Sequence, residues 1–477
     1  TDPAVRMNAS LVPALPERGR VGFFCQSGAL GSSILERLRA RGLGVSTFVS
    51  AGNRADVSGN DLLQYWQDDE DTDLVLMYLE SLGNARKFAR LVRRIAPTKP
   101  VLMVGSPGAA VPSGHLARTS GLGEQAVAGL LAACGQITLD RVDQMLDLAA
   151  VLSCQPMPGS RSVAIVGNSD ALGVLAMNAV ARHGGSVSGQ PVTFPRDATV
   201  ARYRQQVQQA LDRGDVGVVL AIHVPPVEGI DDADLLPQLA AVGAAAAKPV
   251  VAVMQGTGPT TSIRSGVPVF VDVEDAISAL AFLLSLARWR LEGADEPVPA
   301  EGADPERLAE IVQEAVLADR LVLQGPQVSQ VLAALGVQVS IGLPAPAASV
   351  RLRLVTDELF GPVVWASLDD PAAICLGDVA VRLAPMHPAQ ARQAIASLQA
   401  LDTAMVGPEF SDGHHLDGIA DLMHRLSWLP VWVPGVVGLE LTGLHWGIDG
   451  PRAAAATAHL DAEPEPMEPQ ARRMGAG

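Results

Sequence analysis

The chain alternates between short apolar runs and segments of helical periodicity, and this alternation constrains its fold more than any other feature. The run Val21–Cys25 predicts a buried strand, and the segment Gly28–Arg41 that follows it predicts a helix. The apolar face of that helix comprises Leu30, Ile34, Leu35 and Leu38. Strands joined by helical crossovers pair in parallel, because each helix returns the chain to the same end of the sheet. The pattern therefore predicts an α/β fold with doubly wound parallel sheets.

The same pattern recurs along most of the chain. Further expected strands are Val45–Ser50, Leu74–Leu79, Val101–Val104, Val163–Val166, Val216–His223 and Val250–Met254. Further expected helices are Leu62–Trp66, Ala85–Ile95, Glu124–Cys134, Val142–Leu152, Leu172–Arg182, Leu235–Ala246, Ile277–Arg290, Pro305–Leu317 and Val328–Leu335.

Changes in this pattern predict the domain boundaries. Residues 18–155 and 160–291 each hold a series of strand–helix units, so we expect two flavodoxin-like domains with parallel sheets. Residues 292–304 are rich in Pro, Glu, Gly and Ala, which is typical of a linker. Residues 305–460 begin with two helices and continue with mixed short elements, which predicts an α+β domain. Residues 461–477 are predicted to form a disordered tail.

Composition is compatible with such a fold and excludes some classes of function. Hydrophobic residues make up 48% of the 477 residues and aromatic ones 4%, so small and β-branched side chains would fill the layers. The formal net charge of −16 provides no attraction to nucleic acid or to an anionic membrane, and neither is an expected partner. No apolar run reaches membrane-spanning length and no signal peptide is visible. The four cysteines form no CxxC pair, which indicates a reducing, cytoplasmic compartment.

The clearest local motif is the turn that joins the first strand to the first helix. Ser27 supplies a hydroxyl, Gly28 allows a ligand to approach the backbone closely, and the N–H groups from Ala29 onward would face outward. These features predict a phosphate or other anion site at the start of the helix. An ordinary glycine-assisted turn that binds nothing is the alternative, since glycine turns are common at such positions.

A second candidate is the loop after the second strand, which is rich in Gly, Asn and Asp. Ligands of open α/β sheets bind at the carboxyl ends of the strands, so Asn53, Asp56 and Asn60 are candidate substrate-loop residues. The alternative is a structural role, with Asn60 or Asp61 capping the following helix.

Two titratable side chains follow the third and fourth strands of the first domain. Glu80 ends the third strand run, where a carboxylate could orient and charge-stabilise a histidine. His115 lies in a Gly-, Pro- and Ser-rich loop, where a histidine nucleophile could carry a group between sites. The alternatives are a solvent-facing loop acid and a surface histidine.

The second domain has a turn similar to the first. Asn168 and Ser169 precede a predicted helix as further candidate phosphate-binding residues, but Asp170 adds a carboxylate that disfavours an anion. Near the C-terminus, His414, His415 and His424 have no metal-binding spacing and are interpreted as surface residues.

These motifs resemble the NDP-forming (ADP-forming) acetate–CoA ligase, or acyl-CoA synthetase, family, which is related to succinyl-CoA synthetase. The similarity is greatest to the branch fused to a GNAT acetyltransferase. The residues that carry the resemblance are Asn8–Ser10, Cys25–Gly31, Gly52–Tyr65, Tyr78–Ser81, Asn84–Arg90, Gly167–Leu175, Leu359–Val364 and Gly377–Pro385.

The resemblance implies acid–thiol ligation through a phosphohistidine, with CoA and Mg-ATP or Mg-ADP as cofactors. It implies that Ser27 and Gly28 receive the phosphohistidine, that Glu80 holds its imidazole, and that the Gly167–Gly173 turn forms a second site. In the family's loop sequence the histidine falls at Arg118 when Thr119 is aligned, so that His115 is displaced from the expected place.

The resemblance also implies what differs in this chain. Residues 1–17 would be a linker from a CoA-binding domain that is absent, and residues 305–460 a truncated ATP-grasp-like domain. The Pro- and Ala-rich tract Gly342–Ser349 replaces the segment that supplies the nucleotide-binding lysine, so we expect the ATP site to be lost. Glu440 is the one acid left as a weak metal candidate.

Three functions remain open at this point: an incomplete ligase core, a catalytically silent CoA- or acyl-CoA-sensing module of a GNAT protein acetyltransferase, and a remnant with structural value only. Expected partners are small acyl and CoA ligands, a CoA-binding or GNAT domain on a separate or upstream polypeptide, and a second copy of the chain.

Overall fold

The structure, a computed structural model, describes residues 1–10, 12–52, 57–105, 122–195, 198–225, 232–256, 261–293, 296–346, 349–370, 373, 377–399, 401, 414–447 and 450–463. The chain forms two units. The first comprises Thr1–Pro107 with Cys134–Ala294, and the second comprises Gly108–Ala133 with Asp295–Gly477.

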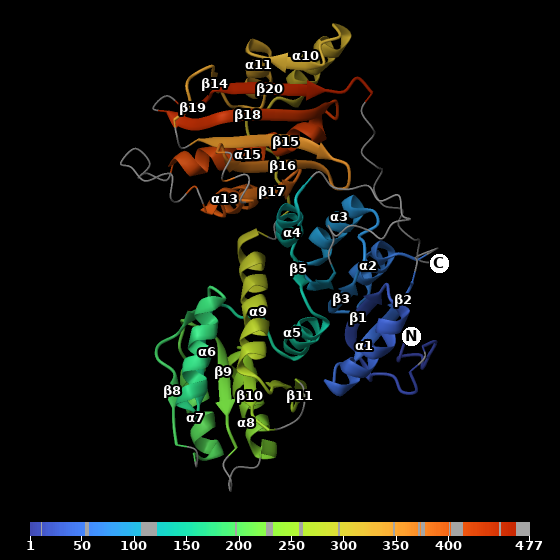
Figure 1. Cartoon of the computed structure of the whole chain (residues 1–477), viewed down its shortest axis with the longest axis vertical. Coiled ribbons are helices and arrows are strands. Elements are labelled where there is room, and N and C mark those ends of the chain that lie inside the picture. The colour runs from blue at the N-terminus through green and yellow to red at the C-terminus, as the bar shows by residue number, and fades with distance from the viewer. Residues whose placement is uncertain are drawn as a thin grey trace. The chain divides into compact units, whose positions relative to one another are not determined.

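The first unit begins with a parallel five-stranded sheet (Figure 1). Its strands are β1 (Arg18–Cys25), β2 (Val45–Ser50), β3 (Leu74–Tyr78), β4 (Val101–Val104) and β5 (Gln136–Leu139). Its helices are α1 (Gly28–Ala40), α2 (Gly59–Asp68), α3 (Ala85–Ile95) and α5 (Val142–Cys154). The strand order is β2-β1-β3-β4-β5, with every neighbouring pair parallel. This is the flavodoxin-like order that the alternation predicted.

Helix α3 illustrates how the sequence determines a local element. Asn84 precedes it, and its side-chain oxygen accepts a hydrogen bond from the Lys87 N–H at 2.9 Å, which is a typical N-cap. Its buried side chains recur at helical spacing, while Arg93 and Arg94 in the last turn complement the negative end of the helix dipole. The predicted bounds of this helix, Ala85–Ile95, are confirmed.

A second sheet in the same unit repeats this topology. Its strands are β6 (Ser162–Gly167), β7 (Ser186–Val187), β8 (Val192–Thr193), β9 (Val216–His223), β10 (Val250–Met254), β11 (Ser262–Arg264) and β12 (Val267–Phe270). Its helices are α6 (Asp170–Arg182), α7 (Val200–Leu211), α8 (Asp232–Ala246) and α9 (Val273–Gly293). The order is β11-β12-β10-β9-β6-β7, with β8 also beside β6, and only β11 pairs antiparallel among these strands. The prediction of two flavodoxin-like sheets is confirmed.

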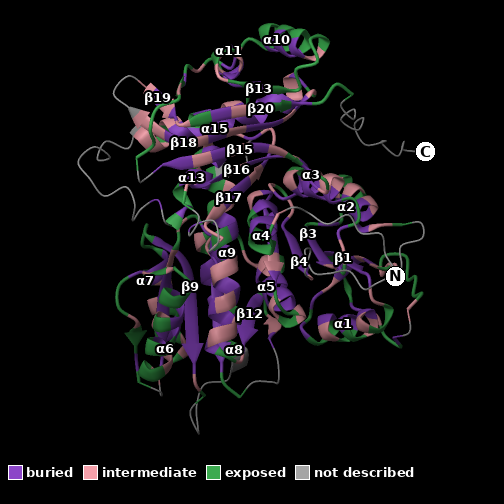
Figure 2. Cartoon of the chain, turned by 45° about the horizontal axis from the view of Figure 1, so that its top comes forward, coloured by how far each residue is buried: buried purple, intermediate pink, exposed green. Residues whose placement is uncertain are grey.

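One hydrophobic core connects the two sheets. Helices α1 and α5 cover one face of the first sheet, and α6 and α9 cover one face of the second, and their buried side chains form a single cluster. The opposite face of the second sheet packs against α7 and α8 in a separate cluster. Figure 2 shows buried residues concentrated in the strands and exposed residues on the outer faces of the helices.

A buried arginine joins the two sheets at the end of α1. The Arg41 guanidinium donates to Asp147 on α5 at 3.1 Å and to Asp143 at 2.9 Å, and the Arg41 carbonyl accepts from the Ile263 N–H of β11 at 2.9 Å. Burial raises the pKa of Asp147, although the charge of Arg41 beside it opposes the shift. A buried charge such as that of Arg41 or Asp147 is stable only when an opposite charge or hydrogen bonds compensate for its removal from water.

The second unit contains a sheet in which every pair is antiparallel except β14 with β19, which is parallel. Its strands are β13 (Val322–Gln324), β14 (Ser340–Ile341), β15 (Val350–Asp357), β16 (Gly361–Leu368), β17 (Val379–Leu383), β18 (Val436–Gly447), β19 (Gly450–Ala453) and β20 (Ala455–Leu460). The helices of this unit are α4 (Glu124–Ala133), α10 (Pro305–Leu317), α11 (Pro326–Ala334), α13 (Pro388–Ala396) and α15 (His414–Trp432). The main order is β13-β20-β18-β15-β16-β17, and β14 pairs with β19. Its core is separate from that of the first unit, as an independent α+β domain requires.

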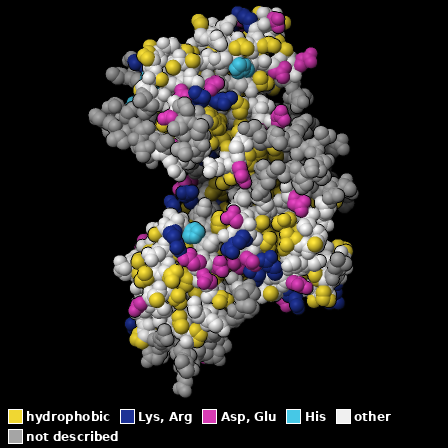
Figure 3. All heavy atoms as spheres, in the orientation of Figure 1, with side chains coloured by type: hydrophobic (Ala, Val, Ile, Leu, Met, Phe, Trp, Pro, Cys, Tyr) yellow, Lys and Arg dark blue, Asp and Glu magenta, His cyan; other side chains and the backbone are white. Residues whose placement is uncertain are grey.

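Acidic and basic side chains are interspersed over the face of the molecule shown in Figure 3. Across the described residues, none of the helices is both long enough and apolar enough to cross a membrane.

We predict that the buried ion pair of Arg41 stabilises the first unit far more than an exposed one does. Arg41→Ala leaves Asp147 buried without its charged partner, so we expect a loss of about 3 kcal/mol or more. Arg18→Ala removes a pair with Asp71 in which both side chains are about 60% exposed, and we expect a loss below about 1 kcal/mol. Urea unfolding followed by circular dichroism measures both, and equal effects of the two substitutions would contradict the prediction.

Candidate functional site

The turn between β1 and α1 presents a free helix N-terminus. Ser27 caps α1, and its hydroxyl oxygen accepts a hydrogen bond from the Leu30 N–H at 3.4 Å. Gly28 and Ala29 are exposed, and a Cβ added at Gly28 would meet no atom of the described residues within 4 Å. Among the residues that the structure describes, none covers Gly28 at the positive end of the helix dipole, and an uncovered helix N-terminus binds anions in many α/β proteins.

Gln26 ties this turn to the end of the neighbouring strand β3. Its N–H donates to the Tyr78 carbonyl at 3.1 Å, and its side-chain oxygen accepts from the backbone N–H groups of Glu80 and Ser81, the latter at 3.1 Å. The Gln26 side chain is buried. This amide therefore fixes the backbone at Glu80 beside the Ser27 turn, and both lie at the carboxyl edge of the sheet.

The Glu80 side chain is exposed, and its negative charge acts on the thiol of Cys25 at the end of β1. Burial raises the pKa of the neighbouring Cys25 thiol, and the Glu80 carboxylate contributes to the same shift. A raised pKa disfavours the reactive thiolate, and Cys25 is buried in the core, which indicates a packing role.

The loop after β2 is described only in part. Two of the predicted site residues in this loop, Asn53 and Asp56, lie outside the described residues. The predicted nucleophile His115, in a later loop, lies outside them as well. Asn60 is buried, and its side-chain amide donates to the Asn84 carbonyl at 3.1 Å, which ties α2 to the start of α3. The cap of α2 is Ser58, paired with Asp61 in a capping box. Of the two residues suggested as caps, Asp61 takes part and Asn60 does not.

The turn between β6 and α6 is built in the same way. Ser169 caps α6 by accepting from the Leu172 N–H at 3.4 Å. Asn168 is buried, and its amide exchanges two hydrogen bonds with Val224 beyond β9, at 2.8 and 2.9 Å. The Asn168 N–H donates to the Ile222 carbonyl at 3.3 Å. Because its side chain is occupied in this way, a ligand here would meet backbone N–H groups and not the Asn168 amide.

The two turns differ at the position that follows the capping serine. The first has Gly28, which leaves the helix end uncovered, whereas the second has the exposed carboxylate of Asp170. A negative side chain in the first turn already neutralises part of the helix dipole. An anion would therefore bind more strongly at the Ser27 turn than at the Ser169 turn.

In the second unit, Glu440 on β18 lies among basic side chains. Its carboxylate is 3.6 Å from the Arg353 guanidinium and 3.8 Å from that of Arg351, and Arg351 also pairs with Asp369 at 2.7 Å. The Arg353 guanidinium lies 5.7 Å from the centre of the Trp365 ring. Across the described residues, no group of three or more His, Cys, Asp or Glu side chains could hold a metal ion.

The interpretation of His424 as a surface residue is wrong. His424 is buried on α15, and its Nε2 atom lies 2.8 Å from the Val298 carbonyl oxygen. Burial lowers the pKa of its imidazole, which favours the neutral form that can donate to this carbonyl. The residue therefore attaches α15 to the segment that precedes α10.

Two family models match parts of the chain. Residues 18–152 match the succinyl-CoA ligase like flavodoxin domain, and residues 329–460 match the ATP-grasp domain. The chain is 25% identical to the acetate–CoA ligase [ADP-forming] I of Archaeoglobus fulgidus, over 92% of this chain and 77% of that enzyme. It is 26% identical to the 4-hydroxybutyrate–CoA ligase [ADP-forming] of Nitrosopumilus maritimus, over 60% of this chain and 45% of that enzyme.

A solved structure shares the fold. The dinucleotide forming acetyl-coenzyme A synthetase 1 of Ca. Korarchaeum cryptofilum, in complex with phosphate and ADP, superimposes with a TM-score of 0.53 and 23% identity. The superposition covers 61% of this chain and 69% of that one. Fold and turns thus define a succinyl-CoA-ligase-like α/β protein with an ATP-grasp domain. Within this class, the chain is related to the ADP-forming acetate–CoA ligases, and the resemblance found in the sequence is confirmed.

We predict that the Gln26 amide controls the order of the backbone at Glu80. Gln26→Ala removes the acceptor of two N–H groups, so hydrogen exchange at Glu80 and Ser81 should accelerate about tenfold or more. Gln26→Glu keeps an acceptor oxygen at the same place and should retain most of the protection. Exchange followed by mass spectrometry tests this, and unchanged rates in Gln26→Ala would refute the role of the amide.

Proposed function

We propose that this chain is the core of an NDP-forming acyl-CoA synthetase, which joins a carboxylic acid to CoA through a phosphohistidine. The observation that carries the proposal is the Ser27 turn, an uncovered helix N-terminus held beside Glu80 by the buried amide of Gln26. The relatives that support it are named as ADP-forming acetate– and 4-hydroxybutyrate–CoA ligases.

In the proposed reaction, inorganic phosphate displaces CoA from an acyl-CoA and yields an acyl phosphate and free CoA. A neutral imidazole nitrogen of His115 then attacks phosphorus, the bond to the acyl oxygen breaks, and the carboxylate leaves. The phosphoryl group passes from His115 to ADP to give ATP, and the ligation direction reverses these steps. Each step transfers one phosphoryl or acyl group and requires no oxidant.

The residues of the turn have separate roles in this scheme. The N–H groups at the start of α1 would bind the phosphoryl oxygens on His115, since anions are stabilised at a helix N-terminus. Glu80 would accept the N–H of the second imidazole nitrogen and so fix the tautomer that attacks. Ser27 shapes the turn through its cap, and its hydroxyl is close enough to the helix end to donate to the same anion.

CoA and Mg-ATP or Mg-ADP are the cofactors implied by these relatives. We propose that this chain has lost most of its affinity for the nucleotide, because Glu440 is already paired with two guanidinium groups. A carboxylate neutralised in this way is a poor ligand for Mg²⁺.

The Ser27 turn, together with the pairing of Glu440 with two arginines, also favours a second candidate. This candidate is a catalytically silent module that senses CoA or acyl-CoA for a GNAT acetyltransferase. Such a module would keep the turn that binds an anion and would need no nucleotide. The two candidates differ in whether His115 becomes phosphorylated. A CoA-binding or GNAT domain on another polypeptide is the partner proposed for either.

We predict that acetyl phosphate labels His115 with an acid-labile, base-stable phosphate. His115→Ala should abolish the label, and Glu80→Gln should reduce it about tenfold or more, because the amide no longer stabilises the charge that develops on the imidazole. His183→Ala is the matched control, since His183 is an exposed histidine at the C-terminal end of α6. Phosphopeptide mapping at alkaline pH is the measurement. Equal labelling of wild type and His115→Ala, or no labelling of either, would exclude the shuttle and leave the silent module.

We further predict that titration calorimetry with Mg-ATP detects no binding to the isolated chain at micromolar affinity. The physical reason is the occupation of Glu440 by Arg351 and Arg353, together with the short Gly342–Ser349 tract. Titration with CoA serves as the parallel measurement on the same preparation. A dissociation constant for Mg-ATP in the micromolar range would contradict the proposed loss.

A further inference from the structure

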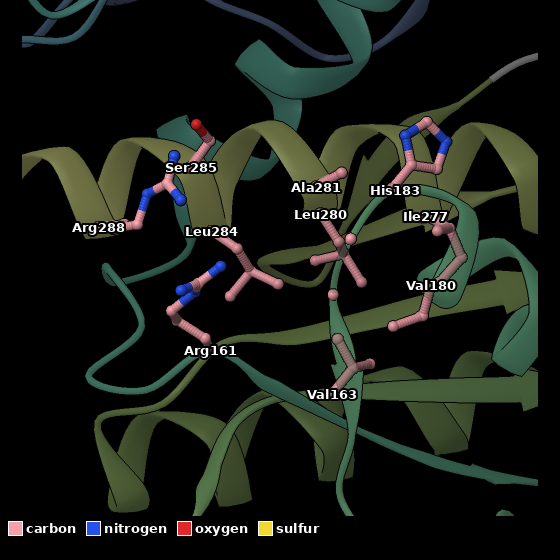
Figure 4. Close-up of a pocket in the computed structure, with 12 residues that line it drawn as sticks. Arg161, Val163, Val180, His183, Ile277, Leu280, Ala281, Leu284, Ser285 and Arg288 are labelled. Carbon is pink, nitrogen blue, oxygen red and sulfur yellow. The ribbon is translucent and has the colours of Figure 1, made fainter. Parts of the chain in front are cut away.

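A cavity lies between α9, the end of α6 and the start of β6. Its volume is about 220 Å³, and its floor is formed by apolar side chains such as Val163, Val180, Leu280 and Leu284. Figure 4 shows these side chains lining the space beneath α9. All the elements that build it belong to the first unit.

The cavity is distant from the candidate site described above. Arg161 precedes β6 and lines the cavity, whereas Ser169 follows β6 and caps α6. The six-residue strand therefore separates the two places by roughly 20 Å, at about 3.3 Å per residue. A ligand in the cavity would not reach the carboxyl edge of the sheet.

Two guanidinium groups approach one end of this cavity. Arg288 extends from α9 and Arg161 from the segment before β6, and Figure 4 shows them reaching toward the same region from opposite sides. Ser285 adds a hydroxyl at this end, while His183 lies at the other end. No acidic side chain is among the described residues that line the cavity.

These arginines lack the strong ion pairs that others in the same unit make. Among the described residues Arg161 has no ion pair, and the Arg288 guanidinium is 4.0 Å from Glu292, with both side chains about half exposed. By contrast, carboxylates lie close to Arg18, Arg20, Arg37, Arg41, Arg182 and Arg213. In a chain of net charge −16, two guanidinium groups left facing one apolar cavity constitute an anion-binding feature.

We propose that this cavity binds a small aliphatic monocarboxylate, with its carboxylate between Arg161 and Arg288 and its hydrocarbon chain against Leu280 and Leu284. The planar guanidinium fork matches a carboxylate, and the apolar floor selects a ligand with a hydrocarbon body over inorganic phosphate. The cavity is smaller than the roughly 300–1,000 Å³ of sites for drug-sized ligands, so the ligand is short. This inference does not depend on the proposed ligase activity.

Titration calorimetry with sodium hexanoate tests the proposal on the full chain. We expect saturable binding that weakens about tenfold or more in the double variant Arg161→Ala with Arg288→Ala, since each guanidinium supplies a charged hydrogen bond. Arg204→Ala removes an exposed arginine on α7 away from the cavity and should leave the affinity unchanged. Hexan-1-ol and inorganic phosphate should each bind at least tenfold more weakly than hexanoate.

A second variant tests the floor of the cavity. Ala281→Phe places a bulky ring in the cavity and should abolish hexanoate binding, with circular dichroism confirming that the protein remains folded. The proposal is overturned if hexanoate does not bind the wild type, if the double arginine variant binds it equally well, or if hexan-1-ol or phosphate binds as tightly. Because the arginines are exposed, their removal tests the site even where Ala281→Phe fails to fold.

Discussion

A buried side-chain amide at the first turn of each parallel sheet is the interaction on which the candidate site depends. A strand in the middle of a parallel sheet must be covered on both faces, so the turn that follows it is the first place where the chain can reach solvent. Gln26 and Asn168 hold these turns against the neighbouring strand by using backbone groups that would otherwise be buried without partners. The helix N-terminus is thereby fixed in direction, which an anion site requires because it must be organised before the ligand arrives.

The Ser27 and Ser169 turns share the same backbone hydrogen bonds but differ in the charge that they present to a ligand. Each has a capping serine and a glycine one turn into the helix, and the carbonyl of that serine accepts from the N–H of that glycine, Gly31 or Gly173. Between the serine and that glycine the two turns differ at one residue, which is Gly28 in the first turn and Asp170 in the second. The two turns share a backbone arrangement, while the charge at the start of the helix differs. The N-terminus of α1 is thus the better candidate site for a phosphoryl group. The N-terminus of α6 would bind an anion more weakly, because the Asp170 carboxylate repels it.

The sequence predicted the layers of the fold better than it predicted the contacts of the site. Continuous apolar runs such as Val216–His223 identify strands buried on both faces, and the structure has β9 at these residues. Short edge strands such as β11 have too few residues for any periodicity. The role of Gln26 was missed because its partners lie 54 and 55 residues further along the chain. The pairing of Glu440 with two arginines depends likewise on the register between β15 and β18, which composition and spacing do not encode.

The two steps of the proposed reaction belong to separate parts of the chain. Phosphoryl transfer to the histidine is proposed at the Ser27 turn of the first unit, and nucleotide binding would belong to the second unit. Formation of an acyl phosphate and its capture by a histidine need an anion site and a base, and the Ser27 turn with Glu80 supplies groups of both kinds. In the proposed scheme, transfer to a nucleotide needs a metal site, whereas the Glu440 carboxylate on β18 lies 3.8 Å from the Arg351 guanidinium and 3.6 Å from that of Arg353. Phosphorylation of His115 and binding of a nucleotide would therefore test different parts of the chain, and each is a separate measure of the proposed function.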